Sequence, residues 1–345
     1  MRRAAILFSA AAFVVFVLAA AAPEASADTS GDFCSQTARL LFSACGAQVT
    51  DDSFVKEAIC INIEDAAERG TCLQELANER TQGNQLCQDQ LDTRLGACLS
   101  LGEGRYDPDT ESSLFDNPKN PTRPNPYFPL KVGNRWTFRS PGESDTVEVL
   151  NATKLIDGVG CIVVRDRVTR DGDLAEDTDD WYAHAKDGAT WYFGEQVKDF
   201  ESFDGDIPRK PELVSIDGSF KAGRTGDKPG VIFLASPKKG DVYLEEFSLA
   251  NAEDVTEILS TKYAFGKDSE LDQSVPRELV QRLCAGDCVV TRNFSLLEPG
   301  IFARKYYARG IGVFLEVEVV PNEPNNVIQL VSCNFDNRCK NLPKP

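Results

Sequence analysis

The sequence contains a single histidine, His184, and a single methionine, the initiator Met1. Zinc enzymes usually hold the metal through two or three histidines, so a site of that kind is excluded within one chain. Haem held by a His/Met pair and most copper sites are excluded for the same reason. No GxSxG motif presents a serine to His184, so we expect this residue to be an ordinary strand residue.

Long hydrophobic runs are also scarce, and the one that occurs lies at the N-terminus. Arg2 and Arg3 precede an uncharged apolar run from Ala4 to Ala22, and Ala25-Ser26-Ala27 provides a small-x-small cleavage site. This order is typical of a secretory signal peptide, which we place at residues 1–27. We therefore predict a secreted or periplasmic protein with no transmembrane segment after cleavage.

Basic residues are too few to balance the acidic ones, because 37 Lys and Arg face 54 Asp and Glu, giving a net charge of −17. A field of this sign repels phosphate backbones and anionic lipid headgroups. The composition therefore predicts no nucleic-acid partner.

All eleven cysteines follow the predicted leader, so we expect most of them to be oxidised. Six of them, between residues 34 and 98, have the mirror-symmetric separations 11, 15, 12, 15 and 11. Nested disulfides across an antiparallel helical hairpin would give this symmetry. The spacing therefore favours the pairs Cys34–Cys98, Cys45–Cys87 and Cys60–Cys72. A symmetric alternative pairs Cys45 with Cys60 and Cys72 with Cys87. Without a CxxC pair or a histidine in this segment, disulfides are favoured over a metal cluster.

The same segment has helical periodicity, with apolar residues and cysteines recurring three or four positions apart. Thr50-Asp51-Asp52 has the composition of a helix N-cap, so we expect a helix to begin there. We therefore predict a Cys-rich helical domain over residues 28–104 and a Pro-rich linker over residues 105–129.

Residues 130–345 have the alternating, turn-punctuated pattern of β-structure. Asp171-Gly172 and Lys186-Asp187-Gly188 separate three alternating runs, which predicts a three-stranded meander over residues 159–196. Further strands are expected at 230–236, 241–249, 253–264, 287–296, 301–308, 311–320 and 326–333. The predicted fold class is α+β: a disulfide-stapled helical domain followed by a mainly antiparallel β domain that forms a closed barrel or a curled half-barrel.

Several segments of the β domain occur in a recognisable order: Phe128-Pro129-Leu130 with Gly133-Asn134-Arg135-Trp136, the run Gly188 to Glu195, Pro229-Gly230-Val231, and Lys305 to Ala308 before Gly310-Ile311-Gly312. In these segments, residues 127–332 resemble a family of secreted bacterial β-rich proteins that has no established activity. The resemblance implies a β-rich exported domain and no particular reaction.

Candidate site residues are of three kinds. Aromatic side chains would line a cavity if the sheet curls without filling itself, and they are Trp181, Trp191, Tyr192, Phe193, Tyr306 and Tyr307. Glu195 and Glu245 are weak candidates for acidic catalysis of the glycosidase type. Asp171, Asp173, Glu176 and Asp180 are weak candidates for Ca²⁺, although their spacing is not that of an EF-hand. No other cofactor is expected.

The remaining five cysteines lie in the β domain. We expect Cys284 to pair with Cys288 and Cys333 with Cys339, which leaves Cys161 as a buried free thiol. The leading hypothesis is an exported, non-enzymatic binding or interaction protein that holds a small apolar ligand or contacts an envelope protein. The alternatives are a hydrolase using acidic residues and a structural envelope component.

Overall fold

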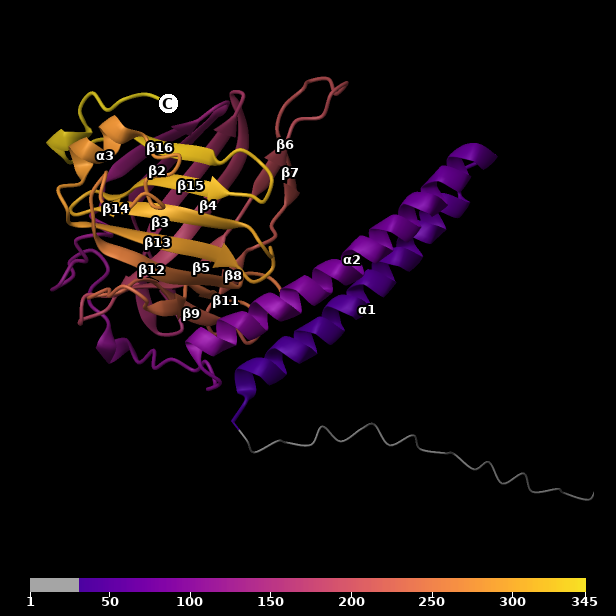
Figure 1. The fold of residues 1–345 in the computed structure, drawn as a ribbon, viewed down its shortest axis with the longest axis horizontal. Helices are drawn as coiled ribbons and strands as arrows, with labels where there is room; N and C mark the ends of the chain where they lie inside the picture. Colours follow the sequence, from indigo (N-terminus) through magenta and orange to yellow (C-terminus); the bar gives the residue numbers. More distant parts are fainter. Residues whose placement is uncertain (1–30) are drawn as a thin grey trace, which may run out of the picture.

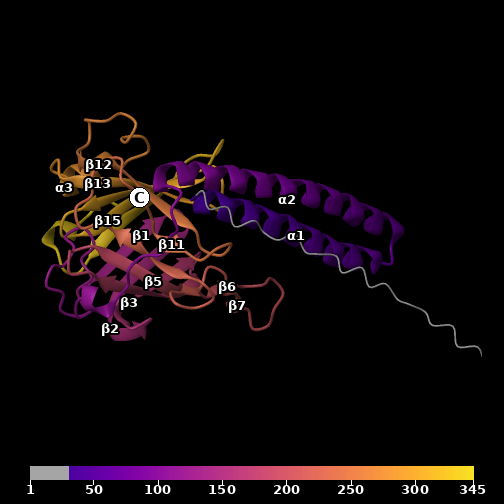
Figure 2. The same ribbon diagram turned by 90° about the horizontal axis from the view of Figure 1, so that it is seen from below.

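The computed structural model describes residues 31–345, so the signal peptide predicted at residues 1–27 lies outside the described residues. The described chain has two parts, a long helical hairpin and a β domain (Figure 1). The hairpin contacts the β domain only with its base, and both views show it extending away from the sheet (Figures 1 and 2). We call this hairpin the arm.

The arm consists of α1, Phe33–Ile61, and α2, Ala66–Leu101. Disulfides join Cys34 to Cys98, Cys45 to Cys87 and Cys60 to Cys72, which is the nested arrangement favoured by the mirror-symmetric spacing. Asp65 caps α2, because its carboxylate accepts hydrogen bonds from the backbone N–H groups of Ala67 and Glu68.

The expected helix start at Thr50-Asp51-Asp52 is wrong, because α1 continues through these residues. The Thr50 hydroxyl donates to the Gly46 carbonyl one turn earlier, so it does not cap a new helix. Local sequence permits both arrangements, and the continuous helix is the one that places Cys34, Cys45 and Cys60 in register with their partners on α2.

The arm has almost no hydrophobic core of its own. Between residues 46 and 86 only Cys60 and Cys72 are buried. Several large apolar side chains in the distal half of the arm are exposed, among them Phe54, Val55, Ile59 and Ile61. The disulfides therefore take the place that apolar packing holds in most helical hairpins.

The β domain is one sixteen-stranded sheet whose neighbouring strands pair antiparallel in the order β10-β12-β13-β14-β15-β16-β1-β2-β3-β4-β5-β9-β11. The short strands β6, β7 and β8 lie off this path. The strands of the first half are β1 Arg135–Ser140, β2 Glu143–Ile156, β3 Val159–Arg170, β4 Asp173–His184, β5 Thr190–Gln196, β6 Asp199–Glu201, β7 Glu212–Ser215, β8 Phe220–Lys221 and β9 Lys228–Phe233. Those of the second half are β10 Val242–Leu244, β11 Glu246–Phe247, β12 Asp254–Tyr263, β13 Cys288–Ser295, β14 Phe302–Ala308, β15 Gly312–Val319 and β16 Asn326–Cys333.

The sheet curls into a nearly closed barrel because its two ends are joined through a single residue. Glu245 lies between β10, which begins the strand order, and β11, which ends it. Gly230 on β9 passes so close to this junction that a Cβ there would lie 2.0 Å from the Glu245 carbonyl oxygen. A residue without a side chain is therefore required where the barrel closes.

The Pro-rich segment packs against the β domain along much of its length. Phe115 is buried beneath β4 and β5 among Trp191 and Phe193, and the Asn125 amide donates to the carbonyls of Gly188 and Leu234. A short helix, η1 Ser112–Leu114, also forms within it. Proline leaves this segment extended, and apolar and amide side chains between the prolines fix it to the sheet.

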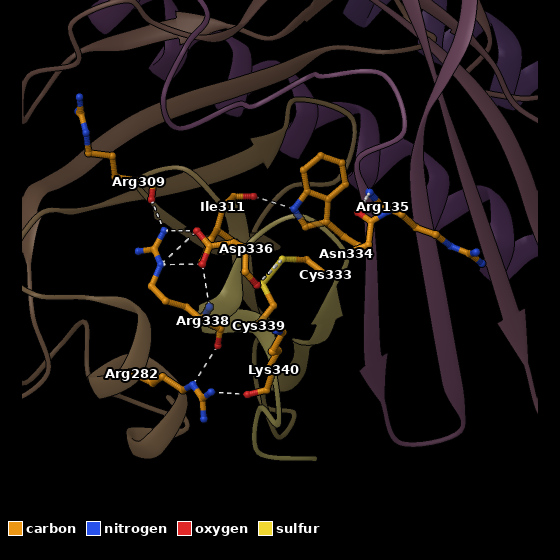
Figure 3. The surroundings of a disulfide bond; sticks show 11 residues. Arg135, Arg282, Arg309, Ile311, Cys333, Asn334, Asp336, Arg338, Cys339 and Lys340 are labelled. Atoms are coloured by element: carbon orange, nitrogen blue, oxygen red, sulfur yellow. Dashed lines mark hydrogen bonds and ion pairs between the residues drawn. A yellow bond between two sulfur atoms is a disulfide. The ribbon is translucent and has the colours of Figure 1, made fainter.

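One face of β12–β16 is covered by the segment 264–287, which includes α3, Arg277–Leu283, a helix that was not predicted from the sequence. Disulfides close short loops on this side between Cys284 and Cys288 and between Cys333 and Cys339. Figure 3 shows the latter beside η2, Asn337–Cys339, where the Arg338 guanidinium binds Asp336 and donates to the Arg309 carbonyl. Arg282 from α3 reaches the carbonyls of Arg338 and Lys340, which fixes the C-terminal segment to the helix.

Candidate ligand cavity

The interior of the curled sheet contains a cavity of about 250 Å³. Eight strands contribute to its wall, from β14 through β16 and β1 to β4, with β9, and residues 128–130 lie against one side. The lining residues are Phe128, Pro129, Leu130, Trp136, Phe138, Asp145, Val147, Val164, Asp166, Asp180, Tyr182, Ile232, Lys305, Tyr307, Gly312, Val313, Glu316 and Ile328. Both halves of the sheet therefore enclose one mostly apolar site.

Three aspartates lie on three neighbouring strands of this wall. Asp145 on β2, Asp166 on β3 and Asp180 on β4 are diagonal neighbours on the inner face, since Asp166 pairs directly with Val147 and Thr178. Diagonal neighbours in an antiparallel sheet are close enough to interact. The Oδ1 atoms of Asp145 and Asp166 are buried, and the two carboxyl groups form a hydrogen bond with each other when one of them is protonated.

The surroundings of these aspartates disfavour ionisation. Burial raises the pKa of Asp145 to about 6, and the charges of Glu176, Glu143 and Glu316 add to the effect. Burial and Asp145 raise the pKa of Asp166 well above its ordinary value. Burial raises the pKa of Asp180 to about 7, although the Tyr192 hydroxyl, which donates to Asp180 Oδ1 at 2.5 Å, opposes this increase.

Lys305 is the only basic residue among those lining the cavity. It lies on β14 directly opposite Glu316 on β15. Burial alone would lower the pKa of Lys305, but Glu316 and Glu245 raise it above its ordinary value. Lys305 is thus favoured in its charged form, and the cavity wall carries four carboxyl groups to one ammonium.

Aromatic rings form much of the remaining wall. Tyr182 stacks on Tyr192 with ring centroids 4.8 Å apart, and Phe128 meets Tyr182 edge-on at 5.3 Å. Trp136, Phe138 and Tyr307 complete this surface. The cavity therefore combines aromatic faces with carboxyl groups.

The structure separates the aromatic residues singled out from the sequence. Tyr307 lines the cavity, and Tyr192 lies behind Tyr182 with its hydroxyl on Asp180. Trp181, Trp191 and Phe193 lie on the opposite face of β4 and β5, where they pack around Phe115. Tyr306 also faces away from the cavity, and its hydroxyl donates to the Leu271 carbonyl. Successive strand residues point to opposite faces, so adjacent aromatics cannot all line one cavity.

The two glutamates considered for catalysis lie outside the cavity lining. Glu195 pairs with Asp180 across β4 and β5, and burial together with Asp180 raises the pKa of Glu195 to about 8. Glu245 is buried at the barrel junction and accepts a hydrogen bond from the Asn293 amide.

The four residues considered for Ca²⁺ have separate partners. Asp171 lies in the β3–β4 turn, Asp173 pairs with Arg209, Glu176 accepts from Thr178, and Asp180 accepts from Tyr192. Within residues 31–345, no group of three or more His, Cys, Asp or Glu side chains is arranged to hold a metal ion.

Two other reactive side chains are buried. Cys161 is an unpaired thiol, and burial raises its pKa to about 12. Burial also lowers the pKa of His184 to about 4, and both of its ring nitrogens lack a hydrogen-bond partner. At neutral pH the thiol is protonated and the imidazole is uncharged.

Most residues of the cavity were not predicted from the sequence, among them the four charged residues Asp145, Asp166, Lys305 and Glu316. A signal for two of them was present, because Asp145 is in phase with Val147 and Val149, and Asp166 is in phase with Ile162 and Val164. A charged residue at an inward position of an alternating strand indicates a buried polar group.

A second cavity, of about 490 Å³, lies where the base of the arm meets the β domain. The Arg94 guanidinium on α2 binds Glu253 through two hydrogen bonds of 2.8 and 2.9 Å, and each side chain is only 4% exposed. The Gln90 amide donates to the Leu297 carbonyl and the Tyr106 hydroxyl to the Pro229 carbonyl. These polar contacts fix the arm to the sheet.

We expect the β domain to be more stable at mildly acidic pH than at alkaline pH. Because the pKa of Asp180 is about 7 in the folded state and near 3.8 in the unfolded chain, the folded state binds more protons between these values. The free energy of unfolding then falls as pH rises through this window, by at most about 1.4 kcal/mol per pH unit. Thermal unfolding of Asp180→Asn should depend less on pH. Asp179→Asn, on the opposite face of β4, is the control, and an unchanged slope in Asp180→Asn would contradict the assignment.

Within the described part of the chain, no helix is both long and apolar enough to span a bilayer. No family model matches the chain, and no curated protein matches it. One solved structure, described as an exported protein with a YmcC-like fold from Bacteroides fragilis, matches 61% of this chain and 98% of its own. The two chains are 10% identical with a TM-score of 0.32, a likeness that carries no conclusion about function.

Proposed function

We propose that this chain is an exported, non-enzymatic binding protein that holds a small ligand in the cavity of the β domain. The observation that carries the proposal is a cavity enclosed by strands from both halves of the sheet and lined by aromatic, aliphatic and a few polar side chains. Ligand sites typically have this composition. The volume of about 250 Å³ lies just below the usual range of roughly 300–1,000 Å³, so it suits a molecule with few atoms. A purely structural barrel would be expected to fill its interior.

The predicted compartment is the periplasm or the exterior of the cell. The leader pattern at residues 1–27 supports export. Five disulfides in the described chain support an oxidising environment. We assign the arm the role of a rigid spacer, since three of these disulfides cross-link its two helices.

Hydrolysis has less support than binding. Glu195 and Glu245 do not line the cavity, and Glu245 is held by Asn293 in a buried position. Asp145 and Asp166, which do line the cavity, are diagonal neighbours on adjacent strands and interact with each other, whereas the two carboxyl groups of a glycosidase flank the bond that is cut.

Native mass spectrometry of the exported protein tests this proposal. We expect the wild type to carry a small molecule, and Val147→Phe to lose it because the added ring occupies the cavity. Val214→Phe, an exposed position on β7, is the matched control and should retain the extra mass. A wild type without any retained molecule, or a molecule retained equally in Val147→Phe, would contradict the proposal.

A further inference from the structure

The cavity wall has an unequal balance of charge. Asp145, Asp166, Asp180 and Glu316 supply carboxyl groups, whereas Lys305 is the only basic side chain in the lining. Lys305 lies opposite Glu316 on β15, whereas the three aspartates lie on β2, β3 and β4. Burying carboxyl groups without a partner is costly, and proteins usually avoid it where nothing compensates.

Two of these carboxyl groups lie next to each other at the cavity. Asp145 Oδ1 and Asp166 Oδ1 are buried, and among the described residues each carboxyl group has only the other within hydrogen-bonding reach, a contact that requires a proton between them. A ligand that replaces this proton must bring a hydrogen-bond donor or a positive charge. Aromatic side chains, including Trp136, Phe138 and Tyr182, lie in the same wall. Aromatic faces and carboxyl oxygens both attract positive charge.

We propose that the ligand of this cavity is a small organic cation, an amine or ammonium compound with an apolar body, held by Asp145 and Asp166. This inference rests on the proposed function and specifies its ligand class. The apolar body would contact the aromatic and aliphatic wall, and the N–H groups would donate to the two carboxylates in place of the proton between them. A small anion would face the three aspartates instead, and the one ammonium group of the wall lies opposite Glu316.

Binding of a cation should release protons. Because the pKa values of the aspartates are raised, the empty cavity retains protons on them to higher pH than ordinary carboxyl groups do, and a bound cation favours their ionised forms. The affinity for a cation should therefore rise with pH, whereas the affinity for a carboxylate ligand should fall. The charged groups that bear on this site are Glu143 and Asp145 on β2, Asp166 on β3, Glu176, Asp179 and Asp180 on β4, Glu195 on β5, Glu245 at the barrel junction, Asp254 on β12, Lys305 on β14 and Glu316 on β15.

Three probes with one phenyl ring each test the inference on the full mature chain: phenethylamine, 2-phenylethanol and 3-phenylpropionate. Isothermal titration calorimetry should show phenethylamine binding most tightly, with a loss of affinity of about tenfold or more per pH unit as the aspartates become protonated. Repeating the titration in buffers of different ionisation enthalpy should reveal proton release. Calcium chloride serves as a fourth probe, for an inorganic cation.

Asp145→Asn and Asp166→Asn should each weaken phenethylamine binding by about tenfold or more. Both variants are expected to fold, because they remove a buried charge and preserve the shape of the side chain. Glu148→Gln is the matched control, since Glu148 lies on β2 but does not line the cavity. This variant should bind phenethylamine as the wild type does.

Equal binding of 2-phenylethanol and phenethylamine would overturn the inference and leave the proposed function standing. Tighter binding of 3-phenylpropionate, or of Ca²⁺ alone in an Asp166-dependent manner, would also overturn it. If no probe binds and the exported protein retains no small molecule, both the inference and the proposed function fail.

Discussion

Replacing Arg94 by alanine is expected to release the arm from the β domain. The Arg94–Glu253 pair is buried at the junction, with both side chains 4% exposed. Removing one partner of a buried ion pair typically costs about 3–5 kcal/mol, because the other charge remains buried without compensation. The Glu253 carboxylate would keep one hydrogen bond, from the backbone N–H of Ala250. Undocking of the arm, which lets water reach Glu253, is the simplest way to relieve the cost.

Hydrogen exchange of backbone amides measures the release of the arm at its junction with the β domain. Amides of the base of α2 and of the strands below it should lose protection in Arg94→Ala, whereas β2 and β3 should retain it. Lys56→Ala is a control on the same arm, because the Lys56–Glu79 pair is solvent-accessible and should contribute about 1 kcal/mol or less. The double variant Arg94→Met/Glu253→Leu should recover much of the lost stability, since no charge is then left buried. Wild-type protection in Arg94→Ala would show that other contacts fix the arm.

Replacing both Cys45 and Cys87 by serine is expected to destabilise the arm by about 4 kcal/mol on the chain-entropy model. This disulfide spans a sequence separation of 42 and is the middle rung of the three. The distal part of the arm has only Cys60 and Cys72 buried, so little packing remains to hold the helices together. The helices should fray and lose far-UV circular dichroism at lower temperature than in the wild type.

The control for this variant is Cys333→Ser/Cys339→Ser, which opens a disulfide with a sequence separation of only 6. On the same entropic model it should cost about 2 kcal/mol and affect the β domain rather than the arm. If the arm of Cys45→Ser/Cys87→Ser melts at the same temperature as in the wild type, side-chain packing between α1 and α2 is sufficient to stabilise it. The conclusion that the arm depends on its disulfides for stability would then be wrong.

Sequence patterns predicted the elements of this fold well where they depend on local chemistry. The mirror-symmetric cysteines favoured nested rungs, because two antiparallel helices with a short connection bring symmetric positions together. The Asp-Gly turns and alternating runs predicted the meander, which the structure forms as β3, β4 and β5. The regular spacing of the cysteines favours the helical hairpin, and the turn residues predict the meander.

The candidate site could be predicted only in part. Adjacent aromatics such as Tyr306 and Tyr307 looked equivalent in the sequence, but one lies in the cavity wall and the other beneath the segment 264–287. The phase of a strand fixes which residues share a face, and the way the sheet curls decides which face becomes the interior.

The sequence by itself indicated the paired helices and the antiparallel strands, because these follow from periodicity, spacing and turn chemistry, and it favoured the nested disulfides over a symmetric alternative. Tertiary structure alone decided between the two disulfide patterns, and it alone decided that the sheet closes through Glu245, that Lys305 lies opposite Glu316, and that Asp145 and Asp166 face one cavity. These residues lie up to 171 positions apart, counted from Asp145 to Glu316. Their meeting depends on how many strands stand between them and how strongly the sheet curls, which no local pattern encodes.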